Sequence, residues 1–406
     1  MTIKPFRGYR YNPAKVGDLS SVVAPPYDQI GPETQARLHG MSPWSIARIT
    51  LSRETYAAAR STLDEWLALG IFEQEATPAL YPYQQRYTVG GRTVTRTGFI
   101  ALGEVTDYAE KVVLPHERTH AEPKEDRLRL LAATEADIGL LFMLFDDPGG
   151  AIRAATAPGG RPLVEARDLK GEIHRLWRIV DPEAIERAQA LMADRRVIIA
   201  DGHHRYETAV AYRRRRPDAR YKLMAFFALD APGVTILPNH RLVRQVAAFA
   251  LERLLADAGK WFEVRPLPSP ITVEPGTIVV VAGRAPQGAV LRLRPEAAVD
   301  IPWPVDTSAA WRRLAVSVLH EGILTPLLGI TAEQLDPRTH VGYTAQAEEA
   351  VALVREDAYQ AAFLIPPVTP EELRAVVAGG ELLPPKSTHF YPKLLDGLVF
   401  YRLGEE

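Results

Sequence analysis

The sequence of 406 residues contains no cysteine. This absence excludes disulfides, thiolate metal ligands and a cysteine nucleophile, so any covalent chemistry must use other side chains. Long apolar runs are also missing. No stretch approaches the ~18 apolar residues that a membrane helix needs, and the first residues lack the apolar core of a signal peptide. We therefore expect a cytoplasmic protein with no membrane partner.

An excess of charge of one sign is missing as well. Charged residues make up 24% of the chain, yet the formal net charge is −2. A chain so close to neutrality lacks the long-range field that draws basic proteins to nucleic acids. We expect a small-molecule substrate and no nucleic-acid partner. The composition does not indicate whether the protein is a monomer or an oligomer.

Segments with helical and with strand periodicity alternate along the chain, which favours a mixed α/β fold. Helices are expected at residues 55–69, 206–215, 246–258, 310–324 and 370–377. Strands are expected at 196–200, 222–229, 277–281 and 361–365, and a β-hairpin at 79–105 that turns at Gly90-Gly91.

The length and a hydrophobic content of 47% suffice for two domains. Closely spaced prolines between residues 266 and 275 favour extended chain over packed elements, so this stretch is the best linker candidate. We expect an N-terminal domain over residues 1–265 and a smaller C-terminal α/β domain over residues 276–406.

A dense polar cluster follows the strand expected at 196–200 and reads Asp201-Gly202-His203-His204-Arg205. A strand that turns at glycine into a helix presents backbone N–H groups and the positive end of the helix dipole, which together favour anions. Arg205 adds a forked donor suited to phosphate, and we expect its loss to weaken phosphate binding with little loss of stability. In the other interpretation, Asp201 caps the helix and the histidines lie on its exposed first turn.

A second cluster reads His116-Glu117-Arg118-Thr119-His120 and matches the H-E-x-x-H pattern of zinc proteases. That mechanism needs both histidines on one face of a sustained helix. Pro123 is expected to hold the residue before it in extended geometry and to leave too few helical turns. We therefore expect no zinc here. A polar functional loop and a solvated charged turn remain as alternatives.

Near the C-terminus, the proline-rich segment 384–393 holds two lysines and two hydroxyl groups. It fits an anion site, and it fits equally an ordered tail that packs its aromatic residues. Each polar cluster lies beside a feature that stiffens the chain, and together they would supply an acid or base, a phosphate cradle and extra cations. We expect the clusters marked by His116, Asp201 and Lys386 to meet in one pocket.

These motifs resemble the family catalogued as domain of unknown function 1015. The resemblance spans nearly the whole chain in order and rests on residues 24–28 (Ala-Pro-Pro-Tyr-Asp), 116–119, 123–128, 200–209 and 384–393. The resemblance to this family implies no particular activity for the chain.

The turn at residues 201–205 is also similar to the phosphate-binding motif of the ParB/sulfiredoxin superfamily, in which free-serine kinases carry an Asp-Gly-His-His-Arg turn. This resemblance implies a ParB/sulfiredoxin-like nucleotide-binding core in the N-terminal part. The lack of cysteine excludes sulfiredoxin chemistry. The near-neutral charge fits poorly with the role of ParB on DNA.

The motifs and the resemblance together favour a nucleotide-binding phosphotransferase, kinase-like, or a phosphohydrolase. It would act on a small metabolite such as the hydroxy amino acid serine and use ATP or ADP with Mg²⁺. The alternatives are a non-catalytic sensor of a nucleotide or phospho-ligand and, third, a metal-dependent hydrolase.

In this hypothesis Asp201 places Mg²⁺ or orients a histidine, and His203 or His204 moves the proton of the acceptor. Glu117 and His116 are further acid or base candidates. The phosphate-binding candidates are Gly202, Arg205, Arg118, Thr119, Lys386, Ser387 and Thr388.

Overall fold

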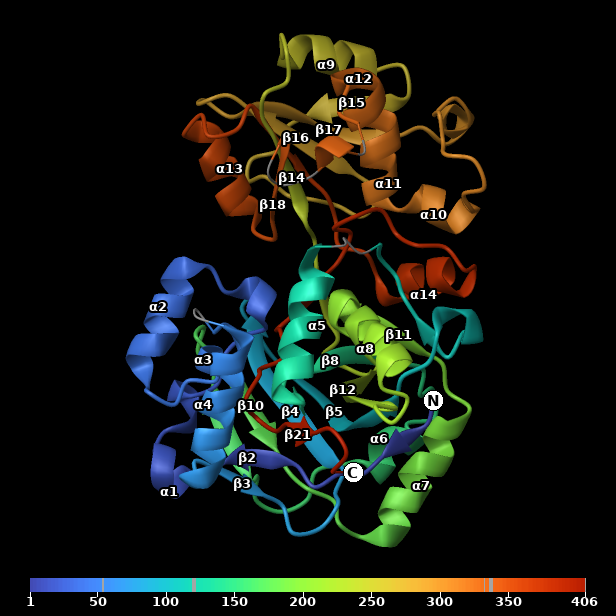
Figure 1. Ribbon diagram of the computed structural model, residues 1–406. Helices are drawn as coiled ribbons and strands as arrows, with labels where there is room; N and C mark the ends of the chain where they lie inside the picture. Colours follow the sequence, from blue (N-terminus) through green and yellow to red (C-terminus); the bar gives the residue numbers. More distant parts are fainter. Residues whose placement is uncertain (53–54, 119–121, 332, 336–338, 406) are drawn as a thin grey trace. The chain divides into compact units, whose positions relative to one another are not determined.

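The computed structural model describes residues 1–52, 55–118, 122–331, 333–335 and 339–405 (Figure 1). The chain forms two compact units, one of residues 1–235 with 392–406 and one of residues 236–391. This division differs from the expected linker at 266–275. Strand β15 (Phe262–Pro266) is an edge strand of the second unit's sheet and pairs with β17 (Gln287–Leu293). The proline-rich stretch 266–275 therefore follows a strand inside that unit.

A nine-stranded mixed sheet runs through the described part of the first unit, in the order β6-β11-β8-β12-β5-β4-β10-β9 with β1 beside β5. Its strands are β1 (Ile3–Lys4), β4 (Tyr81–Val89), β5 (Arg92–Glu104), β6 (Val113–Leu114), β8 (Leu141–Phe145), β9 (Val164–Arg167), β10 (Ile173–Leu176), β11 (Val197–Asp201) and β12 (Tyr221–Ala228). The central strands β8 and β12 are apolar almost throughout, and every residue in them is buried. Such runs are typical of strands covered on both faces.

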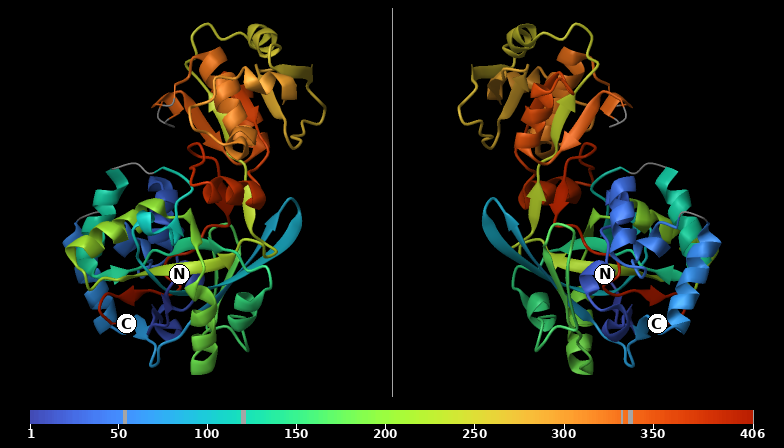
Figure 2. Two further views of the ribbon diagram at one scale, coloured as in Figure 1. Left: turned by 90° about the vertical axis from the view of Figure 1, so that its right-hand side faces the viewer. Right: turned by 90° about the vertical axis from the view of Figure 1, so that its left-hand side faces the viewer.

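The longest hairpin of this sheet joins β4 to β5 and confirms the expected turn. The strands pair antiparallel up to Val89 beside Arg92, and Gly90 and Gly91 between them have φ of 56° and 72°. A two-residue turn of this kind needs positive φ at both positions, which glycine supplies without strain. Figure 2 shows the hairpin, in light blue, reaching beyond the other strands of its sheet.

Two helices, α5 (Glu122–Thr134) and α8 (His203–Arg215), pack side by side against the sheet, and α4 (Tyr56–Ala68) packs on α5 (Figure 1). Helix α4 begins as predicted, because the Thr55 side chain accepts a hydrogen bond from the Ala58 amide at 3.1 Å. The prediction that Pro123 holds Glu122 in extended geometry is wrong. Proline is tolerated in a first helical turn, where its missing N–H has no partner to lose.

The remaining helices of the first unit lie around these layers. They are α1 (Pro13–Val16), α2 (Pro32–Met41), α3 (Ala47–Thr50), α6 (Ala151–Ala155) and α7 (Pro182–Ala193). Helix α7 packs on α6 and on β1. Two further short strands, β2 (Tyr9–Tyr11) and β3 (Phe72–Gln74), pair with each other, and β7 (Ala136–Asp137) pairs with β21 (Tyr401–Arg402) from the end of the chain.

The second unit holds an antiparallel sheet, six-stranded over its described residues, in the order β15-β17-β16-β19-β14-β18. Besides β15 and β17 it contains β14 (His240–Val243), β16 (Ile278–Ala282), β18 (Val341–Thr344) and β19 (Ala361–Leu364). A separate ribbon pairs β13 (Thr235–Leu237) with β20 (His389–Tyr391). The helices are α9 (Leu251–Ala258), α10 (Ala309–Arg313), α11 (Ala315–Leu319), α12 (Thr325–Leu328), α13 (Ala347–Arg355) and α14 (Pro370–Ala378).

Two helices of this unit bear on the sequence predictions. The helix expected at 310–324 is divided, because Leu314 has extended backbone with ψ of 130° between α10 and α11. Helix α14 begins with Pro370 after a capping box of Thr369 and Glu372, in agreement with the prediction. The expected mixed α/β class is confirmed. None of the described helices combines the length and apolar character that crossing a bilayer requires.

Candidate functional site

The first two polar clusters meet at one edge of the large sheet. Strands β6 and β11 pair in parallel, with Leu114 beside Ile198. Since neighbouring parallel strands end at the same edge, the residues that follow them come together. The His116 amide donates to Nε2 of His203 at 3.3 Å, and the ring centroids of the two histidines are 4.7 Å apart. The structure therefore joins the His116 and Asp201 clusters.

Both histidines of this pair are neutral at physiological pH. Burial lowers the pKa of His116, and burial together with the neighbouring His116 holds the pKa of His203 well below its ordinary value. Nδ1 of His116 lies 2.6 Å from the carbonyl oxygen of Ile199, which can only accept, so Nδ1 carries the proton. Nε2 of His203 accepts from an amide, so its proton is on Nδ1. The hydrogen bonds thus assign both tautomers.

Asp201, the last residue of β11, is held between two cations. Nη2 of Arg205 lies 2.6 Å from its Oδ2, and Nζ of Lys393 lies 2.5 Å from its Oδ1. Burial alone would raise the pKa of Asp201, but Lys393 and Arg205 outweigh burial and hold that pKa well below its usual range. The carboxylate is therefore ionised. The interpretation of Asp201 as a helix cap is wrong, because Gly202 takes the N-cap position of α8 and no side chain caps the helix from there.

Gly202 makes the turn from β11 into α8 for two reasons. Its φ is 98°, which other residues adopt only with strain, and a Cβ there would lie 2.7 Å from Cδ2 of Leu141. The first helical hydrogen bond runs from the Tyr206 amide to the Gly202 carbonyl at 2.9 Å. The amides of residues 203–205 precede that bond and lie at the positive end of the helix dipole. This backbone suits an anion.

Arg205 lies in the first turn of α8. Its side chain is buried, and it donates to the Leu140 carbonyl as well as to Asp201. These contacts fix the strand-to-helix turn from inside the unit. The expectation of little stability loss without Arg205 conflicts with this burial, because breaking a buried ion pair leaves an uncompensated charge. Its phosphate-binding role stays a prediction.

Other predicted residues lie around this turn. Glu117 and Arg118 follow β6 in the same loop as His116, where Glu117 is half-buried and Arg118 is exposed. His204 is the second residue of α8, and its carbonyl accepts from the Thr208 hydroxyl at 2.8 Å. Thr119 lies outside the described residues, as does His120.

The tail candidates belong to the second unit. The Asn239 side chain donates to the carbonyls of Lys386 and Thr388 at 3.0 and 3.2 Å, and the Ser387 hydroxyl donates to the Pro384 carbonyl at 2.5 Å. These bonds order the tail segment within its own unit. Their part in phosphate binding stays a prediction.

Asp201 does not fit the expected magnesium ligand. Both of its oxygens are already hydrogen-bonded to a cationic side chain, and Mg²⁺ needs carboxylate oxygens for itself. Over the described ranges, no group of three or more histidine, aspartate or glutamate residues is placed to hold a metal ion.

Sequence reasoning missed two residues of this region. Lys393 was grouped with the C-terminal tail, but the chain returns to the first unit at Pro392 and brings Lys393 to Asp201. Asp396 follows as a single acid within the run Leu-Leu-Asp-Gly-Leu-Val-Phe at 394–400, and it is buried. An isolated acid in an apolar run is the signal that could have drawn attention to it.

The fold and the turn define a mixed α/β protein with a buried histidine pair at a strand-to-helix turn. The chain belongs to the family described as protein of unknown function (DUF1015), whose model matches residues 3–361. No curated protein matches the sequence.

Several solved structures resemble the chain at low identity. A conserved hypothetical protein from Pyrococcus furiosus is 14% identical, covers 72% of this chain and 93% of its own, and gives a TM-score of 0.36. A free serine kinase in complex with AMP is 14% identical, with 73% and 90% coverage and a TM-score of 0.38. SbnI with C-terminal truncation from Staphylococcus aureus is 13% identical, with 73% and 85% coverage and a TM-score of 0.39.

Proposed function

We propose that this protein binds a nucleotide through its phosphates at the N-terminus of α8 and transfers or hydrolyses the terminal phosphoryl group. The observation that carries the proposal is the pair of neutral histidines, His116 and His203, held beside the uncapped start of that helix. Neutral imidazoles with assigned tautomers offer hydrogen-bond donors and acceptors at defined atoms without adding fixed charge. The Asp-Gly-His-His-Arg turn, similar to the one in free-serine kinases, supports the same reaction class.

In this proposal each group of the site has one role in binding or proton transfer. Amides of residues 203–205 and the ammonium group of Lys393 hold phosphate oxygens. His203 donates a hydrogen bond to a phosphate oxygen from Nδ1, because its Nε2 accepts a hydrogen bond from the His116 amide. The phosphoryl group leaves the bridging oxygen of the nucleotide and bonds to the oxygen of an acceptor hydroxyl or water. The acceptor's proton passes to His204 or Glu117, both of which are half-buried beside the turn.

A sensor that binds the phospho-ligand without chemistry is the second candidate. It is favoured by the contacts of Asp201, because a carboxylate engaged by Arg205 and Lys393 is not available to the Mg²⁺ that most phosphoryl-transfer enzymes use. In a sensor, the same amides and Lys393 would bind the ligand and the histidines would only recognise it.

Thermal unfolding in the presence of ligands tests the proposed site. ATP, ADP and small phosphorylated metabolites are compared with adenosine, which has no phosphate. We expect stabilisation by at least one phosphorylated ligand that grows with its concentration, and none by adenosine at the same concentration. Equal stabilisation by adenosine would mean that the base and not the phosphate is bound, and no stabilisation by any phosphorylated ligand would remove the site.

A further inference from the structure

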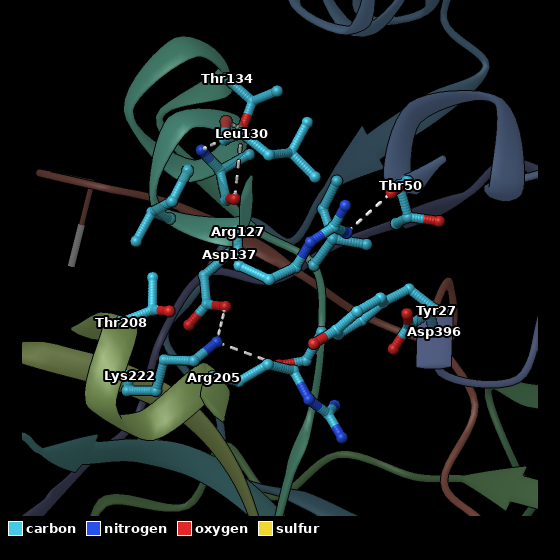
Figure 3. Close-up of a pocket in the computed structure, with 14 residues that line it drawn as sticks. Tyr27, Thr50, Arg127, Leu130, Thr134, Asp137, Arg205, Thr208, Lys222 and Asp396 are labelled. Carbon is cyan, nitrogen blue, oxygen red and sulfur yellow. Dashed lines mark hydrogen bonds and ion pairs between the residues drawn. The ribbon is translucent and has the colours of Figure 1, made fainter. Parts of the chain in front are cut away.

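A cavity of about 70 Å³ lies within the first unit (Figure 3). Its wall includes Arg205 and Thr208 of α8, so it lies next to the strand-to-helix turn at residues 201–205. The other ionisable groups in the wall come from the segment Tyr27–Gln29, from α5, from β7, from β12 and from the C-terminal residues. They are Tyr27, Arg127, Asp137, Lys222 and Asp396.

The cations of this wall are already paired. Lys222 bonds to Asp137 and donates to the Gly139 carbonyl at 3.0 Å. Arg127 donates to Asp126 at 2.7 Å and to the Thr50 carbonyl at 2.8 Å. Arg205 is paired with Asp201. Each positive charge therefore has its own carboxylate, and the lining offers none in excess.

Asp396 is an acidic residue of the wall whose carboxyl group is not paired in this way. Its side chain is only 4% exposed, and its Oδ1 has no hydrogen-bond partner among the residues that the structure describes. The backbone of Asp396 exchanges hydrogen bonds with Ala24 at 2.9 and 3.1 Å, which holds the residue in place at the cavity. Figure 3 shows its carboxyl group beside Tyr27 at the cavity wall. An unpartnered buried carboxylate is costly and calls for a donor.

We propose that this cavity is a binding site for a small molecule with a primary ammonium group, which forms an ion pair with Asp396. An ammonium group supplies three donors and the positive charge that the lining lacks. An anionic ligand would leave Asp396 unpaired. Since a single water needs about 10–15 Å³ of such volume, the cavity suits a ligand of roughly four to six non-hydrogen atoms. Leu130, Leu131 and Ile138 offer apolar surface to its carbon atoms.

The proposed amine site and the strand-to-helix turn at residues 201–205 share one side chain. Arg205 lines the cavity and also bonds to Asp201 at the turn. A ligand on Asp396 would therefore lie against the residue that positions the start of α8. The amine site is argued from the cavity alone and does not require the protein to bind a nucleotide or transfer phosphate.

Isothermal titration of the full chain with two isosteric probes tests the site. Ethanolamine carries an ammonium group where ethylene glycol carries a hydroxyl. We expect wild-type protein at pH 8 to bind ethanolamine and not ethylene glycol. Asp396→Asn should weaken ethanolamine binding about ten- to a hundredfold, as the loss of a charge-assisted hydrogen bond does. Asp194→Asn, the same change at an exposed residue outside the cavity, should leave binding intact.

A second variant tests the cavity while Asp396 keeps its charge. The added methyl group of Gly139→Ala would lie 3.9 Å from Oδ1 of Asp396 and 3.3 Å from Cδ of Arg205. We expect it to weaken ethanolamine binding at least tenfold. Circular dichroism and a thermal melt establish that each variant is folded.

The pH dependence adds an independent readout. Burial raises the pKa of Asp396 to about 7, although Arg205 and Lys222 act in the opposite direction. Ethanolamine affinity should therefore rise with pH through about 7 as the carboxyl group ionises. The charged and titratable groups that face Asp396 are Arg205, Lys222, Arg127, Asp28, Tyr27 and Asp137. Equal affinity for the two probes, equal affinity of the folded Asp396→Asn variant, or no ethanolamine binding by wild type would overturn the proposal and leave a water-filled cavity.

Discussion

Lys393 donates a hydrogen bond from its ammonium group to Oδ1 of Asp201 across a separation of 192 residues. The contact exists because the chain leaves the first unit after Thr235 and returns to it at Pro392. A residue near the end of the chain thus completes a turn formed near its middle. The Asp201 carboxylate at the end of β11 is thus paired with Arg205 of the following helix and with Lys393 of the returning segment.

Lys393 is predicted to contribute to phosphate binding as well as to the ion pair. Lys393→Met should weaken the binding of the phosphorylated ligand that stabilises wild type by roughly 1.5–3 kcal/mol, the range of a charge-assisted hydrogen bond. Lys15→Met, which removes an exposed lysine from α1, is the matched control. Titration calorimetry that gives the same dissociation constant for both variants would remove Lys393 from the site.

Arg205 is predicted to matter for stability. Arg205→Ala should lower the free energy of unfolding by about 3 kcal/mol. The substitution removes one of the two cationic partners of Asp201 and leaves the buried carbonyl of Leu140 without its hydrogen-bond donor. Arg214→Ala removes a surface ion pair with Asp107 and should change it by less than about 1 kcal/mol. Urea unfolding of the two variants measures both. Equal, small losses would show that the Arg205 contacts contribute little.

Gly202 is predicted to be required by packing as well as by backbone conformation. Gly171 has a similar φ of 86°, but a Cβ there would meet nothing within 4 Å. Gly171→Ala should therefore cost roughly 1 kcal/mol for the conformation alone. Gly202→Ala should cost about 1–2 kcal/mol more, because Leu141 is fully buried and cannot move aside freely. A thermal melt that ranks the two variants equally would contradict the packing argument.

Asp396 is predicted to make the protein less stable as pH rises. Its pKa of about 7 in the folded chain lies above the ordinary value of about 3.9, so the folded state holds the proton more tightly between these values. Stability is then highest at low pH and is lost as pH rises through about 7.

Asp396→Asn removes this dependence. Relative to wild type, the variant should gain roughly 2–3 kcal/mol in the free energy of unfolding between pH 5 and pH 8. Other groups titrate alike in both proteins and cancel in the difference. Parallel stability profiles for the two proteins would show that Asp396 titrates normally.

Local features of the fold follow from the sequence. The Thr55 cap, the paired glycines at 90 and 91 and Pro370 in a first helical turn each act through neighbouring residues, and each was predictable. Pro123 was misjudged because proline ends a helix in its interior but suits its first turn, and the sequence alone does not say which applies.

The composition of the site was only partly predictable. The motifs around His116 and Asp201 were visible as dense polar clusters, but their contact depends on the parallel pairing of β6 with β11, which no local pattern encodes. Lys393 and Asp396 arrive by the return of the chain to the first unit. Such long-range placement depends on the whole core, and this limits what spacing can indicate.

The most direct test of phosphoryl transfer is a time course of phosphate and nucleotide product release from ATP and from ADP, with and without Mg²⁺ and with L-serine as an acceptor. Wild type should release product in proportion to time and to enzyme concentration. His204→Gln or Glu117→Gln should lower the rate about 100-fold or more while nucleotide binding is kept, which identifies the proton acceptor. Stabilisation of wild type by nucleotide without any product release would contradict the enzyme and support the sensor.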